Sequence, residues 1–167
     1  SSYSSYLDDY AFCNDRSLSS GTGIGTTVSE YGAYGRLYSS GTPQYKCPQA
    51  NDKFTVSSDN GNGSLTYPIA LLSAGLIYST SLSNSSNYLS MGEDYWLLSP
   101  SDFYKSSYFS TGTAYVWIIE SEGRNRLGPV YNSSTTNYIR PTINLIGDVV
   151  VTSGTGEYNS PYQVSLP

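Results

Sequence analysis

The side chains that could carry out catalysis are few in this sequence. There is no histidine, which removes the commonest general base and every histidine-dependent triad. Serine is abundant, but there is no Ser-x-x-Lys motif, and Asp102 and Lys105 do not by themselves supply an activating base. The carboxylate pairs Asp8–Asp9 and Glu93–Asp94 are adjacent in sequence, so in an extended chain their side chains point to opposite faces. We therefore predict no catalytic residues, and we expect that the protein is not an enzyme.

Oxygen ligands for a metal ion gather in one glycine-rich segment. Asp52, Asp59, Asn60 and Asn62 offer the carboxylate and amide oxygens that calcium prefers. Their spacing does not match the calcium loop with its alternating ligands and distal glutamate, so a solvated turn is favoured over a calcium site. The glycines of residues 21–25 are not followed by a lysine, so a phosphate-binding loop is not indicated. We predict no metal and no cofactor.

The two cysteines, Cys13 and Cys47, have neither a C-x-x-C neighbour nor a histidine beside them. This pattern favours a disulfide in an oxidising compartment over a metal site, and two unpaired thiols are the alternative. On the chain-entropy model, such a bridge would stabilise the fold by roughly 3–4 kcal/mol.

The charge balance excludes two kinds of partner. Eight basic residues stand against thirteen acidic ones, giving a formal net charge of −5, and the basic residues are scattered singly. A nucleic-acid-binding protein clusters its basic residues to neutralise phosphates, so we predict no nucleic-acid partner. The longest apolar runs, Ile69–Leu72, Val116–Ile119 and Val149–Val151, are far shorter than the roughly 20 residues that cross a bilayer. We predict no membrane span in this chain.

The feature with the strongest physical argument for function is a surface rich in Tyr, Ser and Asn. The chain has 18 Tyr, and tyrosine offers a large, stiff contact area while serine and asparagine supply adaptable hydrogen bonds, as in antibody loops. Residues 102–113 and 131–138 concentrate this composition. The candidate contact residues are Phe103, Tyr104, Tyr108, Phe109, Tyr131, Asn132 and Tyr138. They would contact a glycan or protein ligand, or identical subunits in an assembly.

The chain must position these segments with few regular elements. Its 167 residues predict a single domain, 1–167. Pro68 followed by apolar residues at helical spacing predicts a helix over 68–78 that buries Ile69, Leu72 and Leu76. Short strands are predicted at 95–98, 114–119, 128–131 and 138–145, and a hairpin at 148–152 with 162–166. One helix followed by many strands indicates an α+β class. Because the sequence begins Ser1-Ser2-Tyr3, we expect that a segment was removed or that a longer precursor exists.

Several motifs, taken in their order along the chain, resemble a broad bacterial group. This group comprises the C-type-lectin-like domains related to formylglycine-generating enzymes and to the variable proteins of diversity-generating retroelements. The chain also resembles surface and pilin-associated proteins of Firmicutes and related gut bacteria. The motifs that carry the resemblance are Cys13–Ser17, Tyr31–Leu37, Leu65–Ile69, Tyr95–Pro100, Ala114–Trp117, Tyr138–Leu145 and Thr155–Tyr162.

The resemblance implies a C-type-lectin-like fold with short antiparallel strands, one or two helices and much loop, on the outside of a bacterial cell. It implies that the chain ends lie together and that the tail hairpin lies near the N-terminal strand. Arg140 matches a strand position of the group, and we expect it to form a structural hydrogen-bonding fork to backbone carbonyls or a carboxylate. Trp96 is also predicted to be structural. The cysteines of formylglycine-generating enzymes lie near the C-terminal strand, and this chain has no Cys after position 47. We therefore expect an extracellular adhesion or pilus-associated protein that binds through its Tyr/Ser/Asn-rich face. The alternative is a structural subunit of a self-assembling filament or pilus.

Overall fold

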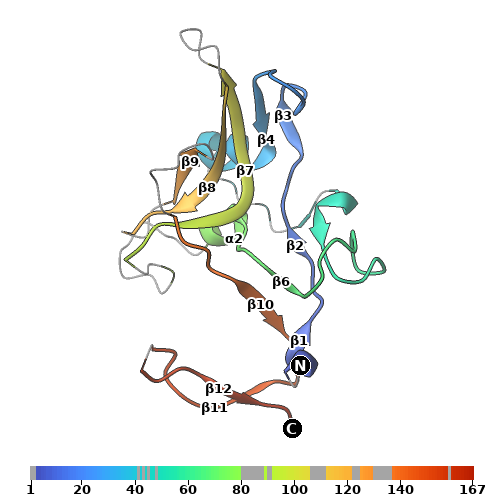
Figure 1. Cartoon of the computed structure of the whole chain (residues 1–167), viewed down its shortest axis with the longest axis vertical. Helices are drawn as coiled ribbons and strands as arrows, with labels where there is room; N and C mark the ends of the chain where they lie inside the picture. The colour runs from blue at the N-terminus through green and yellow to red at the C-terminus, as the bar shows by residue number, and fades with distance from the viewer. Residues whose placement is uncertain are drawn as a thin grey trace.

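The computed structural model describes residues 3–40, 42, 44, 46–47, 49–79, 89, 92–105, 112–121, 125–129, 137–157 and 159–167, and the structure is reported for these residues. Its main body is an antiparallel five-stranded sheet in the order β3-β4-β7-β8-β9 (Figure 1). The strands are β3 (Leu18–Ser20), β4 (Ser29–Tyr31), β7 (Tyr95–Lys105), β8 (Gly112–Ile119) and β9 (Asn125–Pro129).

The long hairpin of β7 and β8 forms the centre of this sheet. Burial alternates along the first half of β7, so Tyr95, Leu97, Ser99 and Ser101 point inward while the residues between them are partly exposed. Two register shifts interrupt the pairing of β7 with β8, and β7 curves strongly in Figure 1. The inward side changes along the strand from large apolar residues to small serines, which leaves room for other segments to approach.

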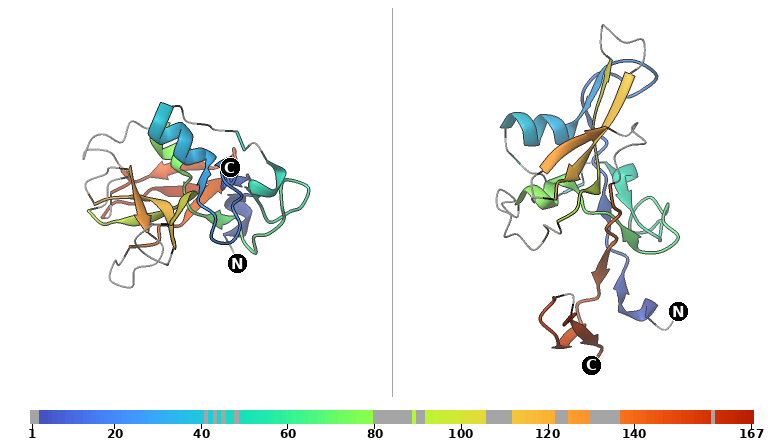
Figure 2. Two further views of the ribbon diagram at one scale, coloured as in Figure 1. Left: turned by 90° about the horizontal axis from the view of Figure 1, so that it is seen from above. Right: turned by 60° about the vertical axis from the view of Figure 1, so that its left-hand side comes forward.

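Two short helical segments cover one side of the sheet (Figure 2). The helix α1 (Gly32–Tyr34) continues directly into the π-helix η2 (Gly35–Ser40), and α2 (Ala74–Ser79) packs against β7. Together they enclose an apolar core of Ala33, Leu37, Ala74, Ile77, Leu89, Tyr95, Leu97, Trp117 and Ile119. None of the helices in the described residues is long and apolar enough to cross a membrane.

Arg140 ties the C-terminal segment to this core. Its guanidinium donates a hydrogen bond of 3.1 Å to the backbone carbonyl of Leu89 and lies 5.5 Å from the ring centroid of Tyr95. The Tyr95 hydroxyl donates to the same carbonyl at 2.8 Å. These are the backbone-carbonyl contacts expected of a structural arginine. Trp96 beside them is partly buried.

Smaller sheets connect the body to the chain ends. β1 (Leu7–Asp8), β10 (Thr142–Leu145) and β6 (Ile69–Ala70) form an antiparallel sheet with β10 in the middle, and β11 (Val150–Ser153) pairs with β12 (Gln163–Ser165). A third pair joins β2 (Phe12–Cys13) to β5 (Lys53–Phe54). The 3-10 turns η1 (Ser4–Tyr6) and η3 (Ala50–Asp52) precede β1 and β5. The two chain ends lie at the same end of the molecule, with the β11–β12 hairpin beside the N-terminal strand, as expected (Figure 1).

The helix predicted over residues 68–78 is wrong in its first half. Only Ala74–Ser79 is helical, whereas Ile69–Ala70 is strand β6. Pairing with β10 places Ile69 opposite Ile143, and this pairing replaces the helical hydrogen bonds that the local spacing favoured. Ile69 and Leu76 are therefore 43% and 49% exposed instead of buried, whereas Ala74 and Ile77 of α2 are buried.

Most predicted strands overlap those found, but the strand predicted at 128–131 begins three residues too late, since β9 spans Asn125–Pro129. The strands predicted at 95–98 and 114–119 are parts of β7 and β8, and the tail hairpin is present. The strand predicted at 138–145 is limited to Thr142–Leu145, because Tyr138 makes only an isolated bridge with Tyr95. Small antiparallel sheets with two short helices and much loop agree with the α+β class.

Candidate functional site: a cavity beside the disulfide

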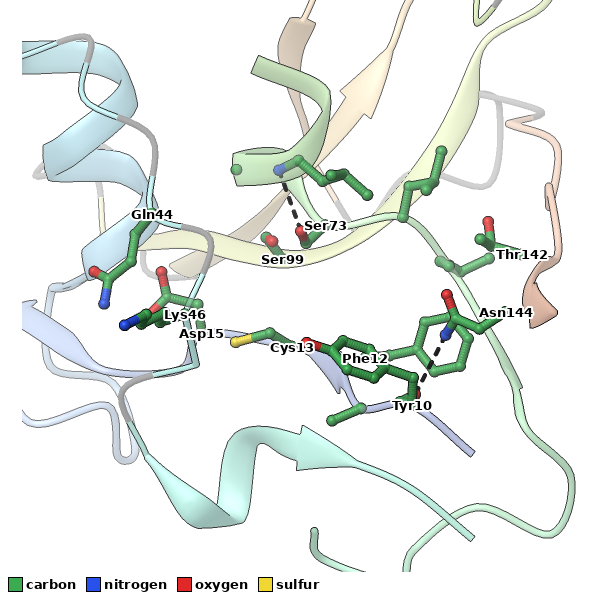
Figure 3. Close-up of a pocket in the computed structure, with 15 residues that line it drawn as sticks. Tyr10, Phe12, Cys13, Asp15, Gln44, Lys46, Ser73, Ser99, Thr142 and Asn144 are labelled. Atoms are coloured by element: carbon green, nitrogen blue, oxygen red, sulfur yellow. Dashed lines mark hydrogen bonds between the residues drawn. The ribbon is translucent and has the colours of Figure 1, made fainter. Parts of the chain in front are cut away.

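A partly enclosed cavity of about 280 Å³ lies between the N-terminal segment, α2 and β10 (Figure 3). Five separate stretches of the chain contribute its walls. The lining residues are Tyr10, Ala11, Phe12, Cys13, Asp15, Gln44, Lys46, Leu71, Leu72, Ser73, Gly75, Leu76, Ser99, Thr142 and Asn144. A volume near 300 Å³ is at the lower end of the range of small-molecule sites, and corresponds to one ring with its substituents.

The cavity has an apolar middle and polar ends. Figure 3 shows Tyr10 and Phe12 along one side, between an end with Asp15, Gln44 and Lys46 and an end with Thr142 and Asn144. Leu71, Leu72 and Leu76 add apolar side chains to the cavity walls. A ligand would therefore place an apolar face against aromatic and leucine side chains and its polar groups at the two ends.

Asp15 is the buried carboxylate at one end of the cavity. Its φ of 51° lies in the left-handed region, which aspartate tolerates better than most residues. The carboxylate forms an ion pair with Arg36 and accepts a 2.7 Å hydrogen bond from the Ser17 hydroxyl. A Cβ at Gly32 would lie 2.6 Å from the Arg36 guanidinium and 2.8 Å from the Ser17 hydroxyl, so a larger residue there would shift one of these side chains. Burial lowers the pKa of Arg36, which stays charged at neutral pH.

Lys46 lies at the same end and is exposed. Because the Asp15 carboxylate already forms an ion pair with Arg36, the polar groups that can bind a ligand at this end are the Lys46 ammonium and the Gln44 amide. At the other end, the Asn144 amide donates a 3.3 Å hydrogen bond to the Tyr10 carbonyl, and the side-chain oxygen of Asn144 can accept a hydrogen bond.

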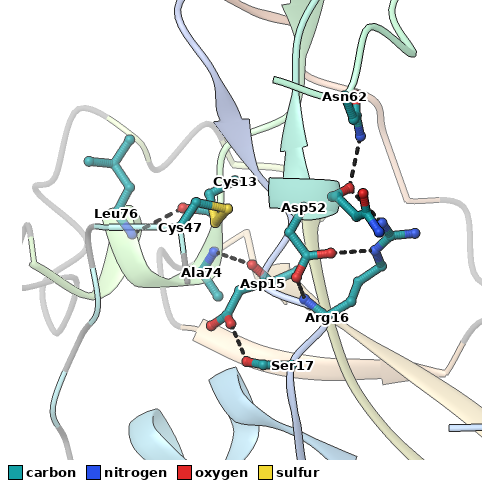
Figure 4. Close-up of a disulfide and its surroundings, with 12 residues drawn as sticks. Cys13, Asp15, Arg16, Ser17, Cys47, Asp52, Asn62, Ala74 and Leu76 are labelled. Atoms are coloured by element: carbon teal, nitrogen blue, oxygen red, sulfur yellow. Dashed lines mark hydrogen bonds and ion pairs between the residues drawn. A yellow bond between two sulfur atoms is a disulfide. The ribbon is translucent and has the colours of Figure 1, made fainter. Parts of the chain in front are cut away.

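The cavity walls are held together by contacts between distant segments. The predicted disulfide is confirmed: Cys13 and Cys47 are joined, with their Cα atoms 5.4 Å apart (Figure 4). This bond fixes the segment that carries Lys46 against β2. On the opposite wall, the backbone N–H of Ala74 donates a 3.0 Å hydrogen bond to the buried hydroxyl of Ser99. The start of α2 is thereby fixed to β7.

An ion pair next to the disulfide secures the N-terminal wall (Figure 4). Asp52 is 1% exposed and accepts hydrogen bonds from the backbone N–H of Arg16 at 2.7 Å and from its Nε at 2.8 Å. The guanidinium also donates to the Asn51 carbonyl at 2.7 Å and lies 5.3 Å from the ring centroid of Phe54. Asp52 thus joins two segments that are 36 residues apart.

These contacts correct the interpretation of the glycine-rich segment as a solvated turn. Asp52 is a buried ion-pair partner, and the Asn62 amide donates to the Asn51 carbonyl at 2.9 Å. The Asn60 amide donates to the Asp9 carboxylate at 3.3 Å. In the part of the chain that the structure describes, no group of three or more His, Cys, Asp or Glu side chains is placed to hold a metal ion.

Two of the adjacent carboxylates also have structural partners. Asp9 accepts hydrogen bonds from the backbone N–H groups of Val56 and Ser57 at 2.7 and 2.8 Å, and these bonds lower the pKa of Asp9. Asp94 accepts a 2.7 Å hydrogen bond from the Ser121 N–H. Sequence analysis of these pairs predicted neither contact, because the partners lie 27 and 47–48 residues away along the chain.

Three of the contact residues predicted from composition, Phe103, Tyr104 and Tyr138, are described by the structure and do not line this cavity. Tyr104 and Tyr138 are 53% and 55% exposed, and Phe103 is partly buried against Gly112. Tyr138 bridges Tyr95 at the start of β7, whereas Tyr104 lies near its end, nine residues away. At about 3.3 Å per residue, the strand length between them approaches 30 Å. Tyr138 and Tyr104 therefore lie near opposite ends of β7. Tyr108, Phe109, Tyr131 and Asn132 lie outside the described residues.

The sequence offered one signal for the cavity, the aromatic residues Tyr10 and Phe12 next to a predicted disulfide. The other walls come from segments whose proximity depends on tertiary structure.

Comparison of the chain with protein-family models, curated proteins and solved structures gives no match.

Proposed function

We propose that this chain is a non-catalytic, extracellular bacterial surface domain of the C-type-lectin-like kind, and that its cavity binds a single sugar unit of a glycan. The observation that carries this proposal is the cavity itself, with an aromatic and leucine-lined middle and polar side chains at both ends. The likeness of the sequence motifs to bacterial surface proteins supports the cellular setting. The disulfide adds support, since such bonds persist in oxidising compartments.

The ligand class follows from the chemistry of the walls. A pyranose ring has an apolar face of C–H groups and an edge of hydroxyls, each of which can donate and accept hydrogen bonds. Tyr10 and Phe12 suit the apolar face, whereas Lys46 donates only and Asn144 can accept, so both hydroxyl functions can be met. The volume of about 280 Å³ admits one ring and leaves adjoining units of a glycan outside the mouth.

The serine hydroxyls at the cavity accept hydrogen bonds from backbone N–H groups and so have structural roles. This supports a binding role for the cavity over a catalytic one. The Ser99 hydroxyl is buried and accepts the Ala74 N–H, and the Ser73 hydroxyl accepts the Leu76 N–H at 3.3 Å. Neither hydroxyl has a base beside it among the lining residues, since Asp15 is held by Arg36 and Ser17.

The test is saturation-transfer NMR of the purified chain with a panel of neutral and N-acetylated monosaccharides. We expect at least one sugar to bind, and we expect Ala11→Phe, which fills the cavity, to weaken binding at least about tenfold. Ala114→Phe introduces the same side chain at an exposed position on β8 and should leave binding unchanged. Equal binding by both variants would place the sugar elsewhere. Binding of indole or phenol, but of no sugar, would contradict the ligand class.

A further inference from the structure

A second cavity, of about 370 Å³, lies between α2, the start of β10 and Leu89. Its apolar walls are Leu72, Leu76, Ile77, Leu89, Pro141 and Ile143. Thr142 and Arg140 complete it, and none of the described residues that line it is acidic. We call it the Arg140 cavity. It shares Leu72, Leu76 and Thr142 with the cavity beside the disulfide, whereas Arg140 lines the second cavity alone.

The apolar walls include both buried and exposed side chains. Ile77 and Leu89 are 0% and 5% exposed and form the inner part of the cavity, whereas Leu76 and Ile143 are 49% and 46% exposed and lie toward its mouth. A hydrocarbon group that enters the cavity would therefore remove the exposed parts of Leu76 and Ile143 from water, which favours binding of an apolar ligand. The volume is within the range of small-molecule sites.

The backbone of Arg140 is held in place from both sides. Pro141 follows it and restricts Arg140 to extended conformations. Two residues earlier, Tyr138 forms a bridge with Tyr95, and two residues later β10 begins at Thr142 and pairs with β6. The charged group of the cavity is therefore positioned before a ligand binds, which reduces the entropy lost on binding.

The guanidinium of Arg140 keeps one edge available for an anion. Nη1 donates hydrogen bonds to the Leu89 carbonyl at 3.1 Å and to the Tyr95 hydroxyl at 3.4 Å. In the part of the chain that the structure describes, Nε and Nη2 have no acceptor, and no carboxylate forms an ion pair with Arg140. Arg16 and Arg36, in contrast, each pair with an aspartate. Nε and Nη2 lie along one edge of the guanidinium, where a carboxylate can accept two parallel hydrogen bonds.

We propose that the Arg140 cavity binds a medium-chain fatty acid as its carboxylate. The carboxylate would pair with Nε and Nη2 of Arg140, and the hydrocarbon chain would lie against the leucine and isoleucine walls. A monoanion suits this cavity, because it carries a single positive group in a protein with a formal net charge of −5. A sugar suits it less well, since six of its eight lining residues are apolar. This inference does not depend on the proposed sugar site.

The test is isothermal titration calorimetry with three probes at pH 7, where octanoate is ionised. Octanoate has the carboxylate and the chain, octanamide has the same chain with a planar neutral headgroup, and acetate has the carboxylate alone. We expect octanoate to bind with a dissociation constant below about 1 mM, and both controls to bind at least about tenfold more weakly. Equal binding of octanoate and either control, or no octanoate binding up to about 10 mM, would overturn the proposal.

The variant Arg140→Gln removes the charge from the cavity. It should weaken octanoate binding to the level of octanamide and change octanamide binding by less than about twofold. Because Arg140 also binds the Leu89 carbonyl, far-UV circular dichroism is needed to show that the variant folds. A folded R140Q that binds octanoate as tightly as the wild type would overturn the assignment of the carboxylate to Arg140.

A pair of variants at Ile143 tests the charge without altering Arg140. Ile143→Asp and Ile143→Asn introduce side chains of nearly equal size that differ in charge. I143D should bind octanoate at least about fivefold more weakly than I143N, because its carboxylate repels the ligand or pairs with Arg140 itself. Ile24→Asp is the matched control, since Ile24 is 78% exposed outside the cavity, and it should bind octanoate as the wild type does. Equal octanoate binding by I143D and I143N would overturn the proposal even if R140Q does not fold.

The variant Ala11→Phe separates this site from the proposed sugar site. Ala11 lines the cavity beside the disulfide but not the Arg140 cavity, so A11F should weaken sugar binding and leave octanoate binding unchanged. Loss of octanoate binding in A11F would place the carboxylate in the cavity that contains Lys46, and would overturn its assignment to Arg140. Octanoate binding as expected, without binding of any sugar, would support the Arg140 site and refute the proposed sugar site alone.

Discussion

Replacing Asp52 with alanine should destabilise the protein far more than its position in a polar, glycine-rich segment indicates. Asp52 is 1% exposed and accepts two hydrogen bonds of 2.7 and 2.8 Å from Arg16. Removing one partner of a buried ion pair costs about 3–5 kcal/mol. The Arg16 side chain is 44% exposed, so part of its charge regains water, and we expect the lower end, about 3 kcal/mol. For a chain of this length, that corresponds to a decrease in Tm of roughly 10 °C.

The assay is urea denaturation followed by circular dichroism, with D59A as the control. Asp59 is exposed in the adjoining turn, so D59A should change the free energy of unfolding by less than about 0.5 kcal/mol. The double variant R16M/D52L removes both charges and should recover part of the loss, because no unpaired charge remains. A loss below about 1 kcal/mol for D52A would show that the pair acts as an ordinary surface ion pair, and would refute this reasoning.

Replacing both Cys13 and Cys47 with alanine should cost about 4 kcal/mol, the chain entropy of a loop whose ends are 34 residues apart. Intact mass after alkylation without reduction should show no added label, and two labelled thiols would contradict the bond. Asp102→Asn should stabilise the protein at neutral pH by about 0.5 kcal/mol, because Asp102 lies opposite Glu30 on the neighbouring strand. Burial is the main cause that raises the pKa of Asp102, and the charge of Glu30 raises it further. The ionised Asp102 carboxylate therefore lowers the free energy of unfolding at high pH. This unfavourable contribution disappears as the pH falls below the unfolded pKa of about 3.9. Urea denaturation of both proteins should therefore converge near that pH, and a less stable D102N at pH 7 would contradict the assignment.

Local pattern was sufficient for the features that depend on neighbouring residues or on residue counts. Two cysteines without metal-binding neighbours predicted the Cys13–Cys47 bond, and short apolar runs bounded by polar residues predicted β7, β8 and the tail hairpin. These features could be predicted because strand and turn preferences act within a few residues, and because two cysteines allow a single intramolecular pairing.

Partners distant in sequence decided the rest. Residues 68–78 have helical spacing, yet pairing with β10 made Ile69–Ala70 a strand, since a hydrogen-bonded neighbour outweighs a weak local preference. Asp52 was buried by Arg16, 36 residues away, although its neighbours in sequence indicated a solvated turn. The cavity needed Tyr10, Lys46 and Asn144 in one place. The sequence by itself determined the composition, the disulfide and most strands. Tertiary structure decided which faces of those strands became cavity wall, core or exposed apolar surface, because burial depends on contacts between segments that no local pattern encodes.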